Sequence, residues 1–325
     1  MDFAAPRASM LKAYLQLFRI SNLPTVVADI LAGALLSHRV FGDWSLFFLT
    51  LLCSSLLYLA GMVLNDYYDV GQDRRERSER PLVRGAIDIR WAGRLGYLLL
   101  GAGILVGWLA GYYGFVTSQT AYAWRPGAVA TVLAGCVVAY DSLLKKTLIG
   151  PVCMGSCRFL NILLGASAAT SESTSDSIFL IFFEPAQLVA AGAIGMYILG
   201  VTLFAQTEAR DSSRWRLFLA TSLIVLGIGL LAVYPGWLPR EDLSIRASRV
   251  PFLASVIGLL ITWRCLRCIP QPTSANVQVA VKTCLLSLII LDAVIVLAVA
   301  DVSYVVGILV LLVPNLVLAR WISST

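Results

Sequence analysis

The sequence predicts an all-α, polytopic membrane protein built as a bundle of about nine or ten transmembrane helices. Of its 325 residues, 58% are hydrophobic and 14% are charged, and the mean hydropathy is +0.81. A soluble domain usually carries about 25% charged residues, so a soluble core of this size does not need so much apolar side chain. The apolar residues also form long runs, and lysine and arginine favour alternate loops between these runs.

Each apolar run is long enough to cross a bilayer, which takes about 20 residues of helix. We expect spans at 19–38, 45–65, 91–116, 126–144, 149–169, 186–207, 215–234, 250–268 and 281–300. The run 303–321 is either a tenth span or a helix packed on the bundle, and Pro314 predicts a kink in it. Because no stretch resembles a linker, we expect a single domain over residues 1–325, with its core at roughly 15–300.

The distribution of lysine and arginine predicts the orientation, since cytoplasmic loops carry an excess of both. With the N-terminus inside, the cluster from Arg74 to Arg94 and most other basic residues lie inside. The basic residues of the outside loops are then only Arg39, Arg125, Arg240, Arg246 and Arg249. We therefore expect a plasma-membrane protein whose N-terminus and acidic loop are cytoplasmic. Its basic residues would set this orientation, and we expect no nucleic acid among its partners.

The stretch NDYYDVGQDRRERSERP, residues 65–81, concentrates charge at the end of the second predicted span. Asp66, Asp69 and Asp73 are spaced i, i+3, i+7, which places them on one face of a helix. Three like charges on one face repel each other unless a cation lies between them. Magnesium binds through carboxylates together with substrate phosphates, and we expect Asn65 either to add an oxygen ligand or to orient a carboxylate. The register therefore predicts a site for Mg²⁺ and a diphosphate.

Other charged residues fit this prediction. Arg80 and Arg84 follow the aspartates, and guanidinium groups match phosphate oxygens. Asp29 and Arg158 lie inside predicted spans, where a charge is a functional hypothesis by default. The role of Asp292, also within a span, stays open between proton handling, a partner for an unseen cation and an interhelical contact. The alternative, a solvated loop that binds anionic lipid, explains RRERSER but not the aspartate register.

At this point the residues resemble a known family. NDYYDVGQD, followed by Arg80 and Pro81, resembles the first aspartate-rich motif, N-D-x-x-D-x-x-x-D, of the UbiA superfamily of intramembrane prenyltransferases. FRISNLPT is similar to the family's first-helix entry, and AYDSLLKKTLIG to its tyrosine-to-lysine segment. The resemblance covers roughly residues 15–300. Within the superfamily, GVTLFAQTEARDSS and CRFLNILLG are similar to the EboC-type branch, found with genes for exporting or processing prenylated or indole-derived metabolites.

The resemblance implies a set of site residues. It implies catalytic roles for Asp66, Asp69, Tyr140 and Lys145, substrate binding by Arg19, Asn22, Asn65, Arg80, Arg84, Lys146, Arg158 and Asn161, and metal ligation by Asp66, Asp69, Asp73, Glu208 and Asp211. It also implies Mg²⁺ as the cofactor and an isoprenyl diphosphate and an unidentified acceptor as partners within the bilayer.

The second aspartate-rich motif departs from the family pattern. A faint internal repeat aligns GMVLNDYYD at 61–69 with GVTLFAQTE at 200–208, which predicts two related halves around a central cavity. In this alignment Glu208 matches Asp69, but Ala205 matches Asp66. The second half therefore keeps acids at Glu208 and Asp211 and lacks one, which puts a second Mg²⁺ in doubt.

The sequence thus predicts Mg²⁺-dependent transfer of a prenyl group from an isoprenyl diphosphate to a small aromatic or lipophilic acceptor. The diphosphate leaves once its charge is neutralised, and the resulting allylic cation is stabilised by aromatic faces, with Tyr140 the best candidate. Two alternatives remain open. A homologue with a degenerate second motif would bind or carry an isoprenoid or a lipid-linked precursor without transfer, and a small-molecule transporter would also have this topology.

Overall fold

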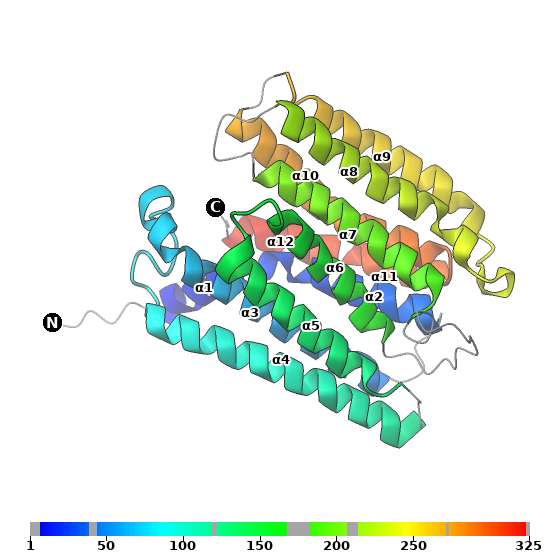
Figure 1. Cartoon of the computed structure of the whole chain (residues 1–325), viewed down its shortest axis with the longest axis horizontal. Coiled ribbons are helices and arrows are strands. Elements are labelled where there is room, and N and C mark those ends of the chain that lie inside the picture. The colour runs from blue at the N-terminus through cyan, green and yellow to red at the C-terminus, as the bar shows by residue number, and fades with distance from the viewer. Residues whose placement is uncertain are drawn as a thin grey trace.

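The computed structural model describes residues 7–38, 44–118, 122–167, 183–206, 214–270 and 273–322, and in these ranges every regular element is helical. The α-helices are α1 (Arg7–Leu17), α2 (Leu23–His38), α3 (Trp44–Glu76), α4 (Ile89–Ser118), α5 (Arg125–Ala139), α6 (Gly150–Ala166), α7 (Pro185–Ala205), α8 (Arg214–Val233), α9 (Val250–Leu266), α10 (Ser274–Leu297), α11 (Val302–Val310) and α12 (Leu312–Ile322). Most of the long helices lie side by side in one bundle, which confirms the all-α prediction (Figure 1).

Nine helical segments in the described part of the chain are long and apolar enough to cross a membrane. They match the predicted spans with two differences. The predicted span 149–169 is not among these nine segments, because α6 has only 17 residues, whereas the tenth predicted run does reach spanning length as Val302–Ile322. This last segment breaks at Leu311, between α11 and α12. The break fits the predicted kink, because Pro314 lacks an N–H and its ring crowds the carbonyl group of Val310.

The helix α3 is longer than its predicted span of 45–65. It continues through the acidic stretch to Glu76, so NDYYDVGQD is helical. No proline interrupts the chain before Pro81, and Arg74 and Arg75 lie in the last turn, where positive charge stabilises the helix dipole. The spanning helix therefore carries the aspartates on a rigid extension of itself.

At the centre of the bundle, α2 packs against α3, α6 and α10. In Figure 1, α2 and α6 lie between the group α3, α4 and α5 and the group α7, α8 and α9. A Cβ atom on Gly33 of α2 would lie 2.1 Å from the carbonyl oxygen of Ile162, and one on Gly165 of α6 would lie 2.5 Å from that of Ile30. Small residues of this kind allow two membrane helices to touch along their backbones.

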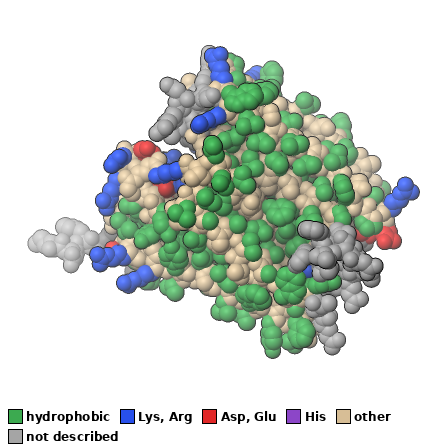
Figure 2. Space-filling model, viewed as in Figure 1, with side chains coloured by type: hydrophobic (Ala, Val, Ile, Leu, Met, Phe, Trp, Pro, Cys, Tyr) green, Lys and Arg blue, Asp and Glu red, His purple; other side chains and the backbone are tan. Residues whose placement is uncertain are grey.

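The outer surface is suited to lipid. Figure 2 shows apolar side chains across the middle of one face, with its lysine and arginine side chains near the edges. On α4, Leu98, Leu105 and Tyr112 point outward and are 65%, 60% and 68% exposed. A soluble protein rarely exposes so much contiguous apolar surface. The chain is therefore an integral membrane protein.

The close contact between α2 and α6 makes a stability prediction. We expect Gly33→Ala to lower the free energy of unfolding by about 1–3 kcal/mol, because the new methyl group displaces a backbone rather than a flexible side chain. The matched control is Gly229→Ala on α8, where a Cβ atom would meet nothing within 4 Å. Thermal unfolding in one detergent compares the two variants, and equal midpoints would contradict the prediction.

Candidate functional site

The end of α3 presents aspartates to the interior of the bundle. Asp66 and Asp73 are buried, and Asp69 keeps a side-chain exposure of 16%. Because α3 stays helical to Glu76, the three carboxylates share one face as predicted. The register therefore brings negative charge together at one end of the bundle.

Two arginines from different segments share the carboxylate of Asp66. Arg19, between α1 and α2, donates to Asp66 Oδ1 at 2.8 Å, and Arg80, in the loop after α3, donates to the same oxygen at 2.5 Å. Burial alone would lower the pKa of the Arg19 guanidinium, but the facing carboxylate of Asp66 outweighs this effect and raises it. Arg19 is therefore a permanent cation at the site.

The backbone of Arg19 is strained. Its φ angle of 43° lies in the left-handed region, which costs a non-glycine residue about 1–3 kcal/mol. The hydroxyl of Tyr58, on α3, donates to the carbonyl oxygen of Arg19 at 2.9 Å, and Asp66 holds the side chain. The surrounding contacts thus fix Arg19 in a conformation that directs its guanidinium group to the aspartates.

Asn65 joins the cations to one another. Its Oδ1 accepts hydrogen bonds from Arg19 and from Lys145 Nζ, both at 3.2 Å, and Lys145 also forms an ion pair with Asp69. Its Nδ2 donates to Asp141 Oδ1 at 2.9 Å. The amide therefore has one orientation, with its oxygen toward the cations and its nitrogen toward Asp141.

Asp141 is the site residue that the sequence analysis missed. It lies with Tyr140 in a π-helical turn, η2 (Tyr140–Leu144), which follows α5, and both side chains are buried. Such wide turns occur often at functional sites. The signal was present in the sequence, because Asp141 is an acid inside the predicted span 126–144, where a charge indicates function.

Several predicted residues do not join this group. Arg84 donates to Gln16 Oε1 at 3.1 Å instead. Lys146 is exposed, and within the described chain neither its side chain nor that of Asn22 hydrogen-bonds to the aspartates.

The second motif is described only in part. Glu208 and Asp211 lie outside the described residues. Gln206, which ends the described stretch, donates from Nε2 to the carbonyl oxygen of Lys145 at 3.1 Å. The end of α7 therefore reaches the segment that carries Lys145.

The first motif offers oxygen ligands that suit a hard cation. Among the described residues, no group of three or more His, Cys, Asp or Glu side chains is gathered closely enough to hold a metal ion. In the described part of the chain, the Oδ2 atom of Asp66 is nevertheless buried without a hydrogen-bond partner, and Asp73 is buried about two turns further on. Carboxylate oxygens without a donor are the ligands that Mg²⁺ takes in proteins, so this chemistry fits the ion.

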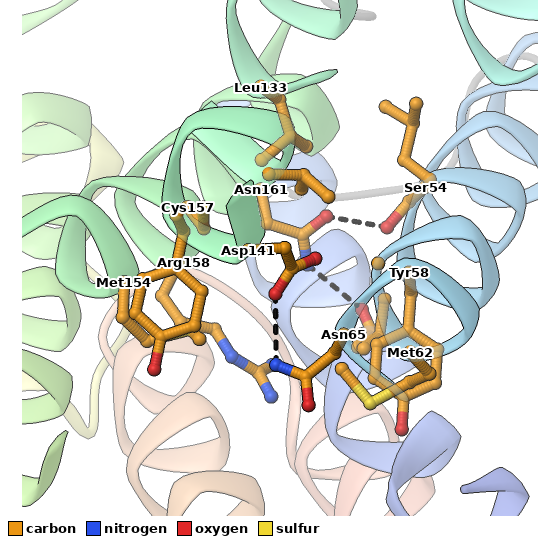
Figure 3. A pocket seen from close by; sticks show the side chains of 15 residues that line it. Ser54, Tyr58, Met62, Asn65, Leu133, Asp141, Met154, Cys157, Arg158 and Asn161 are labelled. Carbon is orange, nitrogen blue, oxygen red and sulfur yellow. Dashed lines mark hydrogen bonds between the residues drawn. The ribbon is translucent and has the colours of Figure 1, made fainter. Parts of the chain in front are cut away.

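A cavity of about 120 Å³ leads from Asn65 and Asp141 into the bundle (Figure 3). It follows α3 back to Ser54, a helix length of about 16 Å at 1.5 Å per residue. Its lining residues are Val26, Ser54, Leu57, Tyr58, Gly61, Met62, Asn65, Leu133, Val137, Tyr140, Asp141, Met154, Cys157, Arg158 and Asn161. The walls are mostly apolar, and polar side chains stand at both ends.

Arg158 and Asn161 form the inner polar end rather than contacting the aspartates of α3. Arg158 donates to Asp29 Oδ2 at 2.7 Å and to Thr25 Oγ1 at 2.9 Å, both on α2. Asn161 donates to Asp29 Oδ2 at 2.8 Å and accepts from Ser54 at 2.5 Å. Arg158, which was predicted to bind substrate, therefore forms an ion pair with Asp29 and also lines the cavity.

Comparison with known proteins agrees with this architecture. A model of the UbiA prenyltransferase family matches residues 26–214, which is more than half of the chain. The chain belongs to the UbiA prenyltransferase family. The match spans α2 to α7, and with them the cavity and the first aspartate motif.

The relatives within the family differ from one another in name. A digeranylgeranylglyceryl phosphate synthase of Sulfolobus acidocaldarius is 36% identical over 98 residues, which is 29% of this chain and 34% of that protein. A protoheme IX farnesyltransferase of Oceanobacillus iheyensis is 28% identical over 144 residues, 40% of this chain and 46% of that protein. The chain thus spans less than half the length of either relative.

A solved structure supports the fold. A UbiA homologue of Archaeoglobus fulgidus, bound to GPP and Mg²⁺, superposes with a TM-score of 0.58 and 13% identity over 84% of this chain and 98% of that one. The UbiA fold therefore extends beyond the residues that the family model matches.

The shared carboxylate makes a prediction about stability. We expect Asp66→Ala, measured with a chelator present, to lower the free energy of unfolding by about 1–3 kcal/mol, because it leaves two guanidinium groups without their acceptor. Glu79→Ala is the control, since Glu79 is an exposed acid of the same segment. A thermal midpoint for Asp66→Ala that equals the control's would refute the pairing.

Proposed function

We propose that this protein transfers a prenyl group from an isoprenyl diphosphate to a lipophilic or aromatic acceptor inside the membrane. One observation carries the proposal: Arg19, Arg80 and Lys145 converge on Asp66 and Asp69 at the mouth of an apolar cavity. This combination suits a ligand with a concentrated negative charge whose reacting carbon lies at the mouth of the cavity.

The cations provide the diphosphate site. Guanidinium groups bind phosphate oxygens in a fixed fork, and Lys145 adds a compact positive charge. In the structure these cations pair with the aspartates. When a diphosphate binds, they would exchange carboxylate oxygens for phosphate oxygens. The cations are therefore in place before the substrate binds, which lowers the cost of reorganisation during the reaction.

Asp66, Asp69 and Asp73, with Asn65 beside them, would hold Mg²⁺. When bound, the ion supplies positive charge that makes diphosphate a better leaving group. Glu208 and Asp211 would add ligands from the second motif. The Archaeoglobus fulgidus homologue binds GPP and Mg²⁺, and the buried unpartnered oxygen of Asp66 supports the same chemistry here.

The cavity would protect the allylic cation that departure of diphosphate leaves. Tyr140 lines it next to Asp141, and aromatic faces attract cations. Its apolar walls exclude water, which would otherwise quench the cation. The tail need not be enclosed, since burying each CH₂ in lipid is worth about 0.8 kcal/mol.

The acceptor and the cellular setting are also proposals. The relatives' names point to different acceptors, so the acceptor is defined only as lipophilic or aromatic. The EboC-type branch remains our narrower assignment from sequence. We place the aspartates on the cytoplasmic side of the plasma membrane, following the arginine and lysine distribution.

A catalytically degenerate homologue is the second candidate. It is favoured by Ala205 and Gln206, which occupy the end of α7 where the repeat predicts a carboxylate. The side-chain amide of Gln206 donates a hydrogen bond to the backbone carbonyl oxygen of Lys145. This amide is uncharged, whereas a carboxylate at this position would be negative. Such a protein would bind the prenyl diphosphate with Mg²⁺ and release it unchanged.

The first test is binding of geranyl thiolodiphosphate, which does not ionise, to the full chain in nanodiscs with and without Mg²⁺. We expect metal-dependent binding that Asp66→Asn plus Asp69→Asn weakens at least about tenfold, or 1.4 kcal/mol. The control is Glu79→Gln, and Glu208→Gln plus Asp211→Asn measures the second motif. Absence of metal-dependent binding by folded wild type would overturn the proposal and favour a transporter or a lipid carrier.

Two neighbouring lysines provide a sharper comparison. We expect Lys145→Met to weaken thiolodiphosphate binding about tenfold, because Lys145 contacts Asp69 and Asn65. Lys146→Met should bind within about twofold of wild type, since that side chain is exposed. Calorimetric titration of both variants decides the point, and an equal loss in the two would remove Lys145 from the site.

A further inference from the structure

The inner end of the cavity is closed by a cluster of polar and charged side chains from four helices. This floor cluster consists of Thr25, Asp29, Ser54, Arg158, Asn161 and Asp292. Asp29 and Asp292 are fully buried, and Arg158 lines the cavity with 16% of its side chain exposed. The cluster therefore forms a polar surface at the end of an apolar cavity.

The floor cluster holds two carboxyl groups and one guanidinium group. Asp29 bonds to Arg158, and Asp292, on α10, faces both of them. If both acids are ionised, the cluster carries one net negative charge. If they share a proton, as close carboxyl groups do, the cluster is neutral. In either state the positive charge of Arg158 is already balanced.

Asp292 reaches the floor cluster from α10, which also packs against α2. Arg158 and Asn161 already make hydrogen bonds from α6 to α2. Both carboxyl oxygens of Asp292, and Oδ1 of Asp29, accept no hydrogen bond from a described donor group, and Asp292 lies close enough to Asp29 for the two carboxyl groups to share a proton. A buried acid in a membrane bundle is costly, and Asp292 adds a second carboxyl group where the one guanidinium group of the cluster already has an acid partner. Its effect is on the charge of the floor cluster.

The cavity suits a ring-sized body with a polar group at its inner end. Val26, Leu57, Leu133 and Val137 provide apolar walls. Its volume of about 120 Å³ is comparable to an engineered cavity of about 150 Å³ that holds benzene. An isoprenoid tail carries no oxygen that could accept a hydrogen bond from Arg158, whereas a compact acceptor with a polar group does.

We propose that this cavity receives the acceptor and that the floor cluster selects a neutral polar group at the acceptor's inner end and rejects a carboxylate. A neutral carbonyl, amide or hydroxyl oxygen accepts a hydrogen bond from the exposed part of Arg158. A carboxylate would bring a further negative charge to Asp29 and Asp292, where no cation is left to balance it. That the bound molecule is the acceptor rests on the proposed prenyl transfer. The preference of the cavity for a neutral group over a carboxylate does not depend on it.

The test uses benzamide and benzoate, which match in size and shape and differ in charge. Their dissociation constants are measured by calorimetry on the full chain in nanodiscs, with empty nanodiscs as the blank. We expect wild type to bind benzamide at least about tenfold more tightly than benzoate. Asp29→Asn plus Asp292→Asn keeps the shape of the floor cluster but frees the charge of Arg158, so the preference should invert and benzoate should raise the thermal midpoint of this variant.

Ser287→Ala on α10 is the matched control and should retain the wild-type preference, because Ser287 bonds to Tyr197 outside the cavity. If the double variant does not fold, Arg158→Gln is measured instead and should reduce benzamide affinity at least about fivefold. A wild-type preference for benzoate, a ratio unchanged in the double variant, or binding of neither probe would overturn the inference.

The design separates this inference from the proposed function. The probes are titrated both in the presence and in the absence of Mg²⁺ and geranyl thiolodiphosphate. Diphosphate binding without discrimination between the probes would overturn the inference alone. Discrimination without diphosphate binding would overturn the proposed function and leave the selective cavity in place.

Discussion

The carboxylate of Asp66 is the interaction on which the site depends. It is buried in a bundle that offers little water, so its charge must be matched by the protein, and Arg19 and Arg80 supply that match from two separate segments. Through this one group the junction of α1 and α2, the end of α3 and the following loop are held in register. The strained backbone of Arg19 exists because these contacts outweigh its cost.

Much of this arrangement was predictable from sequence because it depends on local periodicity. Length and hydropathy predicted the spans, and the spacing of Asp66, Asp69 and Asp73 predicted a single helical face. Arg80 follows the motif in sequence and bonds to Asp66, and Lys145, for which the family resemblance implied a catalytic role, pairs with Asp69. Pro314 predicted the break between α11 and α12, since a proline disturbs the turn that precedes it.

The remainder depends on how distant segments meet, which periodicity does not encode. Arg158 was expected to reach a phosphate, but its ion pair with Asp29 was not expected, because it depends on the packing of α2 against α6. Asp141 was overlooked, and its contact with Asn65 depends on how the π-helical turn after α5 packs against α3. Arg84 follows the motif in sequence, yet the loop directs it to Gln16. Sequence spacing thus predicted partners on one helix better than partners between helices.

The touching glycines of α2 and α6 lie about one turn from polar residues that close the cavity: Gly33 follows Asp29 by four positions, and Gly165 follows Asn161 by four. Helix separation and the shape of the cavity's inner end are therefore set by the same contact. Replacement of either glycine by a larger residue during evolution would move Asp29 relative to Arg158 without changing any residue that contacts the substrate. Divergence in substrate range can consequently begin outside the cavity, at positions that a comparison of cavity-lining residues alone would not include.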